Sequence, residues 1–481
     1  MNPYATATQI VAACRRGETS AAAMVEQCRE RRERLRDRIN AIVTPDYARA
    51  LETARQLDSN RTGSTGVLHG LPLTIKDGIH VAGLPSTGGM IEPTQAIATE
   101  DAPNVRSLRD AGAVVLGKTN IPVANADWQA VNPLFGRTTN PWNADLTSGG
   151  STGGGAAAVA SGLSAAELGS DIGGSIRIPA AFCGLFGHKP SWSVMPRSGH
   201  FPGQNVPNPA RGLAVQGPLA RSAADLELLF GVLCGAEGLE GKGWRLALPA
   251  ARFDRLAGCR VGVLRLPDWI RVEGVILDAQ QALCDTLAQR GARVQEFDVT
   301  PLLGDLGTYY RHYLTLLQCL LAGQLPAATR VKAASKMRGY HDPFLDAVAD
   351  GLEGSAGLLV DLVEASERWK LAWERVFRDV DVLLSPVCST SAFPHDDGYF
   401  YDRTLGVDGQ RMPYYQLSAL PSLATLGGLP ATVFPTGRFA PTGAPIGLQV
   451  MGAYLEDRST LRFAQLVEAE TGGFTPPPDL Q

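Results

Sequence analysis

Two serines in glycine-rich turns are the residues of this chain best suited to chemistry. Ser151 lies in the run T-S-G-G-S-T-G-G-G, and Ser175 directly follows Gly173 and Gly174. Glycine adopts positive φ without steric cost, so such a turn can aim several backbone N–H groups at one point. Donors arranged in this way form the oxyanion hole that amide hydrolysis requires. Ser175 therefore stands where a nucleophile is expected.

A serine hydroxyl needs a base, and the chain offers few histidines for that task. Of the seven histidines, only His188 and His200 follow Ser175 closely. Lysine can act instead, because burial disfavours the ammonium form and lowers its pKa. Lys76 ends the apolar stretch L-P-L-T-I-K, which predicts a buried strand. In such a strand Asp77 points away from Lys76 and would not hold the lysine charged.

The motifs around these residues resemble the amidase signature family of serine hydrolases. The resemblance is densest over residues 66–218, the expected signature core with the catalytic residues, and it returns at 427–461. It implies an α/β amidase-signature fold, in which a central mixed β-sheet is covered by helices on both faces. It also implies a single catalytic domain over residues 1–481.

The family resemblance assigns a role to each of the three candidate residues. In amidase signature enzymes the first serine of the G-G-S-S-G-G run lies 24 residues before the nucleophile, has a cis peptide bond and relays protons. Ser151 and Ser175 have this separation. The resemblance thus implies Lys76 as base, Ser151 as bridging serine and Ser175 as nucleophile. It places the oxyanion hole on the backbone N–H groups of Ile172, Gly173, Gly174 and Ser175.

Three neighbours are expected to support the triad. Thr152 stands where the family commonly has a second Ser or a Gly, so a hydroxyl is kept and a methyl group is added. Arg177 lies close to Asp171 and is expected to brace the loop rather than to contact substrate. By contrast, His188 and Lys189 lie in a turn rich in Gly and Pro and are expected to be exposed.

The loop that follows the lysine departs from the family pattern. Gly78, His80 and Met90 fill positions where other residues are commoner. Because this loop often borders the scissile bond in the family, Met90 is a candidate for substrate binding. Gly149 and Gly150, beside the bridging serine, are the other two candidates.

Three further motifs fit the sequence less well. Residues 149–153 match the nucleophile elbow G-x-S-x-G and would make Ser151 the nucleophile, but an elbow needs a preceding strand, and residues 138–148 are rich in turn formers. Residues 112–119 match a P-loop, yet their A-V-V-L core reads as a strand. Residues 153–158, G-G-G-A-A-A, can be forced onto a dinucleotide fingerprint, but a helix with small residues for close packing is the simpler interpretation.

The composition suits a cytoplasmic enzyme with a small-molecule substrate. The formal charge of −4 gives no broad attraction to nucleic acid or to an anionic membrane. We expect neither a signal peptide nor a membrane span. The eight cysteines are scattered without a C-x-x-C pair, which indicates reduced thiols and no metal site. The family resemblance implies no cofactor, and a homodimer is left open.

Helical and strand patterns alternate along the chain, as an α/β fold requires. Helices are expected within 8–55, at 104–111, from 223 onward and at 275–290. Strands are expected at 67–75, 113–116, 261–264, 382–384 and 431–434. Residues 300–420 are less regular and carry many aromatic side chains; in the family this variable portion helps to shape the substrate pocket. Residues 472–481, with three consecutive prolines, are expected to form an extended tail.

The resemblance implies an amidase that hydrolyses a carboxamide C–N bond through an acyl-enzyme on Ser175. Related enzymes cleave fatty, aryl and amino-acid amides, and some cleave esters or carbamates, so these substrates stay open. Two alternatives are kept. One is the A subunit of a tRNA-dependent amidotransferase, and the other is a non-catalytic binding protein on the same fold.

Overall fold

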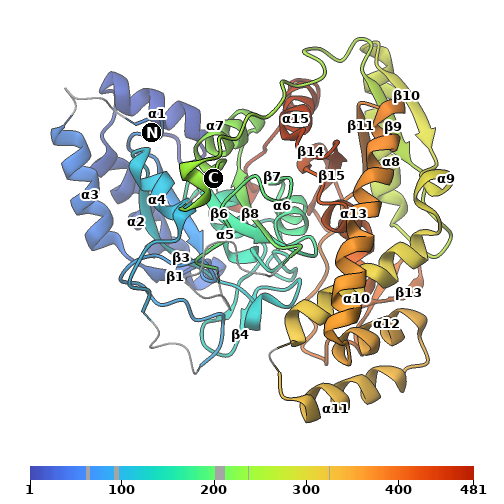
Figure 1. Cartoon of the computed structure of the whole chain (residues 1–481). Coiled ribbons are helices and arrows are strands. Elements are labelled where there is room, and N and C mark those ends of the chain that lie inside the picture. The colour runs from blue at the N-terminus through green and yellow to red at the C-terminus, as the bar shows by residue number, and fades with distance from the viewer. Residues whose placement is uncertain (61–65, 92–96, 201–211, 237, 324, 481) are drawn as a thin grey trace.

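One long β-sheet runs through the molecule (Figure 1). The computed structural model describes residues 1–481 except 61–65, 92–96, 201–211, 237, 324 and 481. Residues 92–96 and 201–211 of the expected signature core, 324 of the segment 300–420 and 481 of the expected tail therefore lie outside the described residues. Within the described chain, the strands of this sheet are β1 (Ile42–Pro45), β2 (Pro72–Lys76), β3 (Val114–Thr119), β6 (Ala166–Asp171), β7 (Phe186–Lys189), β8 (Val215–Ala220), β9 (Arg260–Leu264), β10 (Arg293–Phe297), β11 (Val382–Pro386), β14 (Ala431–Phe439) and β15 (Pro445–Met451). Separate hairpins pair β4 (Val131–Asn132) with β5 (Gly136–Arg137), and β12 (Thr404–Val407) with β13 (Gln410–Pro413).

The sheet is mixed, as the sequence predicts. Its strand order is β1-β3-β2-β6-β8-β7-β14-β15-β11-β9-β10. Strand β2 is parallel to its neighbours β3 and β6, and β9 is parallel to β11 and β10. The strands from β6 to β11 pair in antiparallel fashion, as do β1 and β3. The sheet therefore has two groups of parallel strands joined by an antiparallel centre, with β1 as an antiparallel edge strand beside the first group.

Helices cover both faces of the sheet, which confirms the predicted fold class. They are α1 (Ala7–Arg16), α2 (Ala21–Ile39), α3 (Tyr47–Ser59), α4 (Pro103–Asp110), α5 (Gly153–Ala160), α6 (Arg177–Cys183), α7 (Ala223–Leu233), α8 (Gly274–Gln289), α9 (Thr300–Leu303), α10 (Leu306–Ala322), α11 (Ala327–Arg338), α12 (Pro343–Leu352), α13 (Ala356–Asp379), α14 (Ala419–Leu426) and α15 (Asp457–Thr471). Helices α5 and α6 share an apolar cluster with Leu219 of β8, whereas α7 shares another with Ala220. Successive residues of a strand point to opposite faces, so these helices lie on opposite sides.

The segment 300–420 is more regular than its sequence suggests. Helices α10 to α13 occupy most of residues 306–379 and gather at one end of the molecule, away from α1 to α3 (Figure 1). Each of these helices buries part of its surface; α13, for example, buries Leu362, Trp373 and Phe377 and exposes Val360 and Leu371. The prediction of an irregular segment is wrong for most of residues 306–379, because aromatic side chains such as Tyr309, Tyr310 and Phe344 lie on buried faces of helices.

The N-terminal prediction of helix is correct except for one short strand. Residues 8–55 form α1, α2 and α3, but β1 interrupts them and pairs antiparallel with β3. A four-residue edge strand between two helices leaves too few residues for a visible alternation. Strand β3 itself spans Val114–Thr119, so the P-loop-like run is a strand, as predicted.

The C-terminal tail is not free of the fold. Residues 478–480 form a single 3₁₀ turn, and Leu480 is buried. Its carbonyl oxygen accepts hydrogen bonds from Tyr4 Oη (2.8 Å) and from Arg31 Nη2 (2.5 Å). The two ends of the described chain are therefore tied to each other, and the prediction of an extended tail holds only for the residues before this turn.

The eight cysteines are all free thiols. Six are buried, and Cys234 and Cys319 are partly exposed. Separately, no helix in the described ranges is long and apolar enough to cross a bilayer.

The glycines of α5 allow the close packing that the sequence predicts. A Cβ atom at Gly155 would overlap the carboxylate end of Glu167, which is buried on β6. We expect Gly155→Ala to lower the free energy of unfolding by about 1–3 kcal/mol because the core is overpacked. The helical Gly231→Ala is the matched control, since its Cβ would meet no atom within 4 Å; it should stabilise by about 0.5–1 kcal/mol. Urea denaturation measures both, and equal effects would contradict the packing argument.

Candidate active site

The carboxyl ends of two neighbouring strands bring the candidate base to the site. Lys76 is the last residue of β2, and Ser170 lies near the end of β6. The strands are paired in parallel, with Ile75 opposite Leu168. Parallel strands end at the same edge of a sheet, so the Lys76 side chain can reach Ser170.

The amine of Lys76 lies among uncharged oxygen atoms. Its Nζ donates to Ser151 Oγ at 2.7 Å and to Ser170 Oγ at 2.9 Å, and the Ser170 carbonyl oxygen is 3.4 Å away. The side chain is fully buried. Burial lowers the pKa of Lys76 to about 7, although the charges of Asp171 and Glu167 act in the opposite direction. A neutral amine that can accept a proton is therefore available near neutral pH.

Ser151 lies in the turn before α5. The peptide bond between Gly150 and Ser151 is cis, as the family resemblance implies. The residues before this turn make only isolated bridges, at Leu146 and Thr147, and no strand of the sheet. A nucleophile elbow requires such a strand, so the elbow interpretation of Ser151 fails. Ser151 is instead the direct partner of the lysine.

Asp171 organises the loop that carries Ser175. Its carboxylate accepts hydrogen bonds from the backbone N–H groups of Gly174 and Ile176, both at 3.0 Å. Gly174 has a φ of +96°, a conformation that glycine adopts without steric cost. The bond to Asp171 engages the Gly174 N–H, which was expected to belong to the oxyanion hole. Among the described residues, the N–H groups of Ile172, Gly173 and Ser175 donate to no protein acceptor.

Arg177 braces this loop, as predicted. Its guanidinium donates to both carboxylate oxygens of Asp171, at 3.1 and 2.9 Å, and both side chains are fully buried. The remaining donors reach Pro421 O, Gln449 Oε1 and Thr425 Oγ1. Burial alone would raise the pKa of Asp171, but the charge and hydrogen bonds of Arg177 lower it to about 2. Asp171 is thus ionised and fully paired.

Thr152 connects the two serine turns. Its backbone N–H donates to the Ser175 carbonyl oxygen at 3.1 Å, and its hydroxyl donates to the Ser170 carbonyl oxygen at 3.3 Å. The supporting role expected of Thr152 therefore has a structural basis in the hydrogen bonds of both its backbone and its side chain.

Sequence reasoning missed a second hydrogen-bonded path to the lysine. Ser170 Oγ, which accepts from Lys76, is 2.8 Å from His200 Nε2, and His200 lines the cavity described below. Glu167 lies deeper, accepts from Thr119 Oγ1 at 2.6 Å, and burial raises its pKa to about 7. The spacing of His200 after Ser170 gives no sign of this contact, because a loop brings the two together.

His188 and Lys189 are buried rather than exposed, so their predicted exposure is wrong. Strand β7 carries both into the centre of the sheet, where His188 contacts Thr432 (2.9 Å) and Asp457 (3.2 Å). Lys189 Nζ donates to the carbonyl oxygens of Pro190 and Leu429. These hydrogen bonds satisfy the polar atoms that burial removes from water. Neither residue lines the cavity at Ser175.

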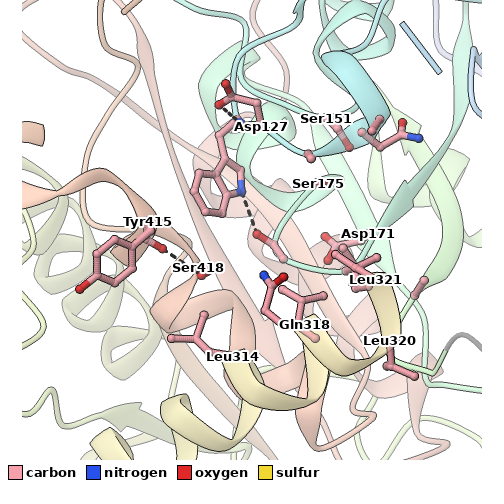
Figure 2. A pocket seen from close by; sticks show the side chains of 18 of the residues that line it. Asp127, Ser151, Asp171, Ser175, Leu314, Gln318, Leu320, Leu321, Tyr415 and Ser418 are labelled. Carbon is pink, nitrogen blue, oxygen red and sulfur yellow. Dashed lines mark hydrogen bonds between the residues drawn. The ribbon is translucent and has the colours of Figure 1, made fainter. Parts of the chain in front are cut away.

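A cavity of about 410 Å³ opens in front of Ser151 and Ser175. Helix α10 lies opposite the loop of Ser175, with Leu314, Gln318 and Leu321 toward the cavity (Figure 2). Four of the aromatic residues of 300–420 line it: Tyr313, Phe400, Tyr401 and Tyr415. The lining is predominantly apolar, and within the described chain it contains no Lys or Arg.

The polar side chains of Asp127 and Gln318 in the cavity wall differ in their hydrogen bonding to the protein. Asp127 is neutralised, because it accepts hydrogen bonds from Arg403 Nη1 and Tyr414 Oη, both at 2.6 Å. Gln318 makes no side-chain hydrogen bond to another described residue, so its amide is available to a ligand. Asn125, which also lines the cavity, has no hydrogen-bond partner for its amide either. The cavity thus presents an apolar surface with two unpaired amides among the described residues.

The predicted substrate-binding residues do not line this cavity. Met90, Gly149 and Gly150 are absent from its described lining. A Cβ at Gly150 would overlap the Asp127 carbonyl oxygen, and one at Gly149 would lie 2.8 Å from Pro179 Cα. These two glycines therefore serve the packing of the Ser151 turn.

Comparison with known proteins gives the family of the chain. The Amidase family model matches residues 23–461. An indoleacetamide hydrolase of Bradyrhizobium diazoefficiens is 31% identical over 97% of this chain and 86% of its own length. The A subunit of the glutamyl-tRNA(Gln) amidotransferase of Thermosynechococcus vestitus is 30% identical over 95% of this chain and 96% of its own. A solved amidase structure superimposes with a TM-score of 0.77 at 30% identity, over 97% of this chain and 100% of that one.

The chain belongs to the amidase family, whose members are hydrolases of carbon–nitrogen bonds. Its fold is the amidase-signature fold that the sequence predicts.

The buried ion pair of Asp171 with Arg177 predicts that a substitution of Asp171 lowers the stability of the protein strongly. Asp171→Asn leaves the buried guanidinium without its counter-ion, and we expect the free energy of unfolding to fall by about 3–5 kcal/mol. Glu18→Gln is the control, because its partner Arg16 is exposed and little stability should change. Chemical denaturation at neutral pH compares the two variants. A loss no larger than that of the control would show that Asp171 does not hold the loop.

Proposed function

We propose that the chain is an amidase that hydrolyses a carboxamide C–N bond through an acyl-enzyme on Ser175. The observation that carries the proposal is the buried Lys76 amine, 2.7 Å from the hydroxyl of Ser151. A lysine with a lowered pKa can act as a general base where no histidine serves.

In the proposed reaction, Ser175 Oγ attacks the acyl carbon while its proton passes through Ser151 to Lys76. The C–N bond then breaks, and the amine leaves with the proton that Lys76 returns through the same path. A water molecule attacks the acyl-enzyme, its proton follows the same path, and the carboxylic acid is released from Ser175. No net proton is left on the enzyme.

The oxyanion of each tetrahedral intermediate needs fixed donors. The free N–H groups of Ile172, Gly173 and Ser175 are our candidates, since the N–H of Gly174 is engaged by Asp171. Removal of one such donor in a serine hydrolase costs a factor of about 10²–10³ in kcat.

The cavity favours an acyl group that is apolar and uncharged. Trp128, Leu314, Leu317 and Phe400 contribute to its apolar lining, and Gln318 offers one hydrogen-bonding group. A flat aromatic or a branched aliphatic acyl group would remove this surface from water. The similarity to an indoleacetamide hydrolase supports an arylacetamide as the first substrate to try. Esters and carbamates of the same shape are the next candidates.

The second candidate is the A subunit of a tRNA-dependent amidotransferase, because a relative of that kind is 30% identical to the chain. Such a protein takes ammonia from a donor amide. If that donor is an amino acid such as glutamine, its charged groups call for opposite charges in the pocket. The described cavity lining offers no Lys or Arg side chain for a carboxylate. This favours the small-molecule amidase, and a non-catalytic protein would have no use for a buried lysine between two serines.

A fluorophosphonate probe tests the proposed nucleophile. We expect one covalent adduct, on Ser175, and none in Ser175→Ala, because the proposed mechanism uses Ser151 to pass on a proton and Ser175 to attack. Lys76→Ala should slow labelling by about 10²-fold or more, which is typical for loss of a general base. Intact-mass spectrometry and peptide mapping measure this, with the buried Ser161→Ala as control. An adduct on Ser151 would refute the assignment.

Hydrolysis of two amides by the wild-type protein distinguishes the two candidate functions. Release of ammonia from indoleacetamide but not from glutamine supports the amidase, whereas the reverse preference supports the amidotransferase.

The pH dependence of hydrolysis tests the role of Lys76. Its pKa is lowered to about 7, so kcat/KM should rise as the amine loses its proton and level off above that pH. Below the pKa the ammonium cannot accept a proton, and the rate should fall about tenfold per pH unit. The intrinsic fluorescence of the protein over the same range controls for unfolding. A profile that is flat from about pH 5 to 9 would exclude Lys76 as the base.

A further inference from the structure

Two side chains of the cavity wall hold the carbonyl groups of the loop before Ser175. Tyr313 Oη donates to the Ile172 carbonyl oxygen at 3.0 Å. Trp128 Nε1 donates to the Gly173 carbonyl oxygen at 2.9 Å. Both side chains line the cavity and are buried, and Tyr313 belongs to α10 rather than to the signature core. Helix α10 therefore touches the catalytic loop through a tyrosine hydroxyl.

The two peptide units of this loop are held in different ways. A trans peptide unit is planar, so its C=O and N–H point in opposite directions. The unit between Gly173 and Gly174 is held at both ends, by Trp128 at its carbonyl and by Asp171 at its N–H. The unit between Ile172 and Gly173 is held at its carbonyl by Tyr313. The N–H of Gly173 has no acceptor among the described residues.

We propose that Tyr313 is a positioning residue for the oxyanion hole. By binding the Ile172 carbonyl, it turns the N–H of Gly173 toward the oxygen that becomes charged when Ser175 attacks. This inference rests on the proposed function of the site. Oxyanion donors act by being oriented before the reaction, so a peptide unit free to rotate would lose much of its effect.

The contact between Tyr313 and the loop requires a residue without a side chain at position 173. A Cβ at this position would lie 2.9 Å from Tyr313 Oη, and the next nearest atoms are 3.9 Å away. Gly173 is not among the glycines with positive φ, so its backbone conformation alone does not call for glycine. The missing Cβ instead leaves room for the tyrosine hydroxyl at the loop.

The test compares Tyr313→Phe with a matched control, Tyr309→Phe. Tyr309 lies one helical turn earlier on α10, is equally buried, and also donates its hydroxyl to a backbone carbonyl, that of Leu423, at 2.9 Å. It does not line the cavity. The readouts are kcat and KM for indoleacetamide, the Ki of an arylboronic acid that forms a tetrahedral adduct on serine, and the melting temperature.

We expect Tyr313→Phe to lower kcat about tenfold with KM within about twofold, since the interaction matters in the transition state. The Ki of the boronic acid should rise by a similar factor. Tyr309→Phe should keep kcat and Ki within about twofold of the wild type, although its melting temperature falls, because stability and catalysis are separate readouts.

Three results would overturn the inference: an unchanged kcat in Tyr313→Phe, an equal loss in Tyr309→Phe, or a loss of kcat with unchanged boronic acid affinity. Gly173→Ala adds a second variant, which should displace the hydroxyl and lower kcat in the wild-type background but add little further loss in Tyr313→Phe. Additive losses in the double variant would argue against a shared role.

Failure of the proposed function is distinguishable from failure of this inference, because the wild type would then neither hydrolyse the amide nor be labelled on Ser175.

Discussion

The site depends on an amine that is buried without a carboxylate of its own. An ion pair would hold Lys76 charged, and a charged lysine could not accept a proton. Asp171 is near enough to act in this way, but Arg177 and two backbone N–H groups occupy its carboxylate. The lysine is left with the oxygens of Ser151 and Ser170. The buried ion pair of Asp171 with Arg177 thus holds the loop and also keeps the Asp171 carboxylate from pairing with Lys76.

The sheet supplies the precision that this arrangement needs. Lys76 and Asp171 end the neighbouring parallel strands β2 and β6, so strand pairing fixes their separation. Ser151 arrives from the turn before α5, whose glycines bring the helix close to Asn120 and Glu167. Side chains on strands, such as those of Lys76 and Asp171, keep their geometry better than side chains on loops.

The sequence predicted the fold class, and it singled out Lys76 and Ser151, which the structure brings within 2.7 Å of each other. Both came from motifs and spacing that are local or carried by the family. Its errors concern contacts made over long distances in the chain. His188 and Lys189 were predicted to be exposed, because the sequence does not show that they lie on a central strand of the sheet. That strand buries both residues and brings His188 to Asp457. The link from Lys76 through Ser170 to His200 depends on a loop that returns to the sheet. The sequence alone does not show which residues such a loop contacts in the folded protein.

The cavity draws its walls and its chemistry from different parts of the chain. The proposed catalytic groups belong to the sheet and its turns, whereas much of the apolar wall belongs to α10 and to residues near 400. Such a division lets selection or engineering exchange the wall and retain the reaction. The hydrogen bond of Tyr313 to Ile172 sets a limit to this exchange. If Tyr313 positions the loop as we propose, a chimaera with a foreign α10 must keep a donor at this position, or the rate will change together with the substrate preference.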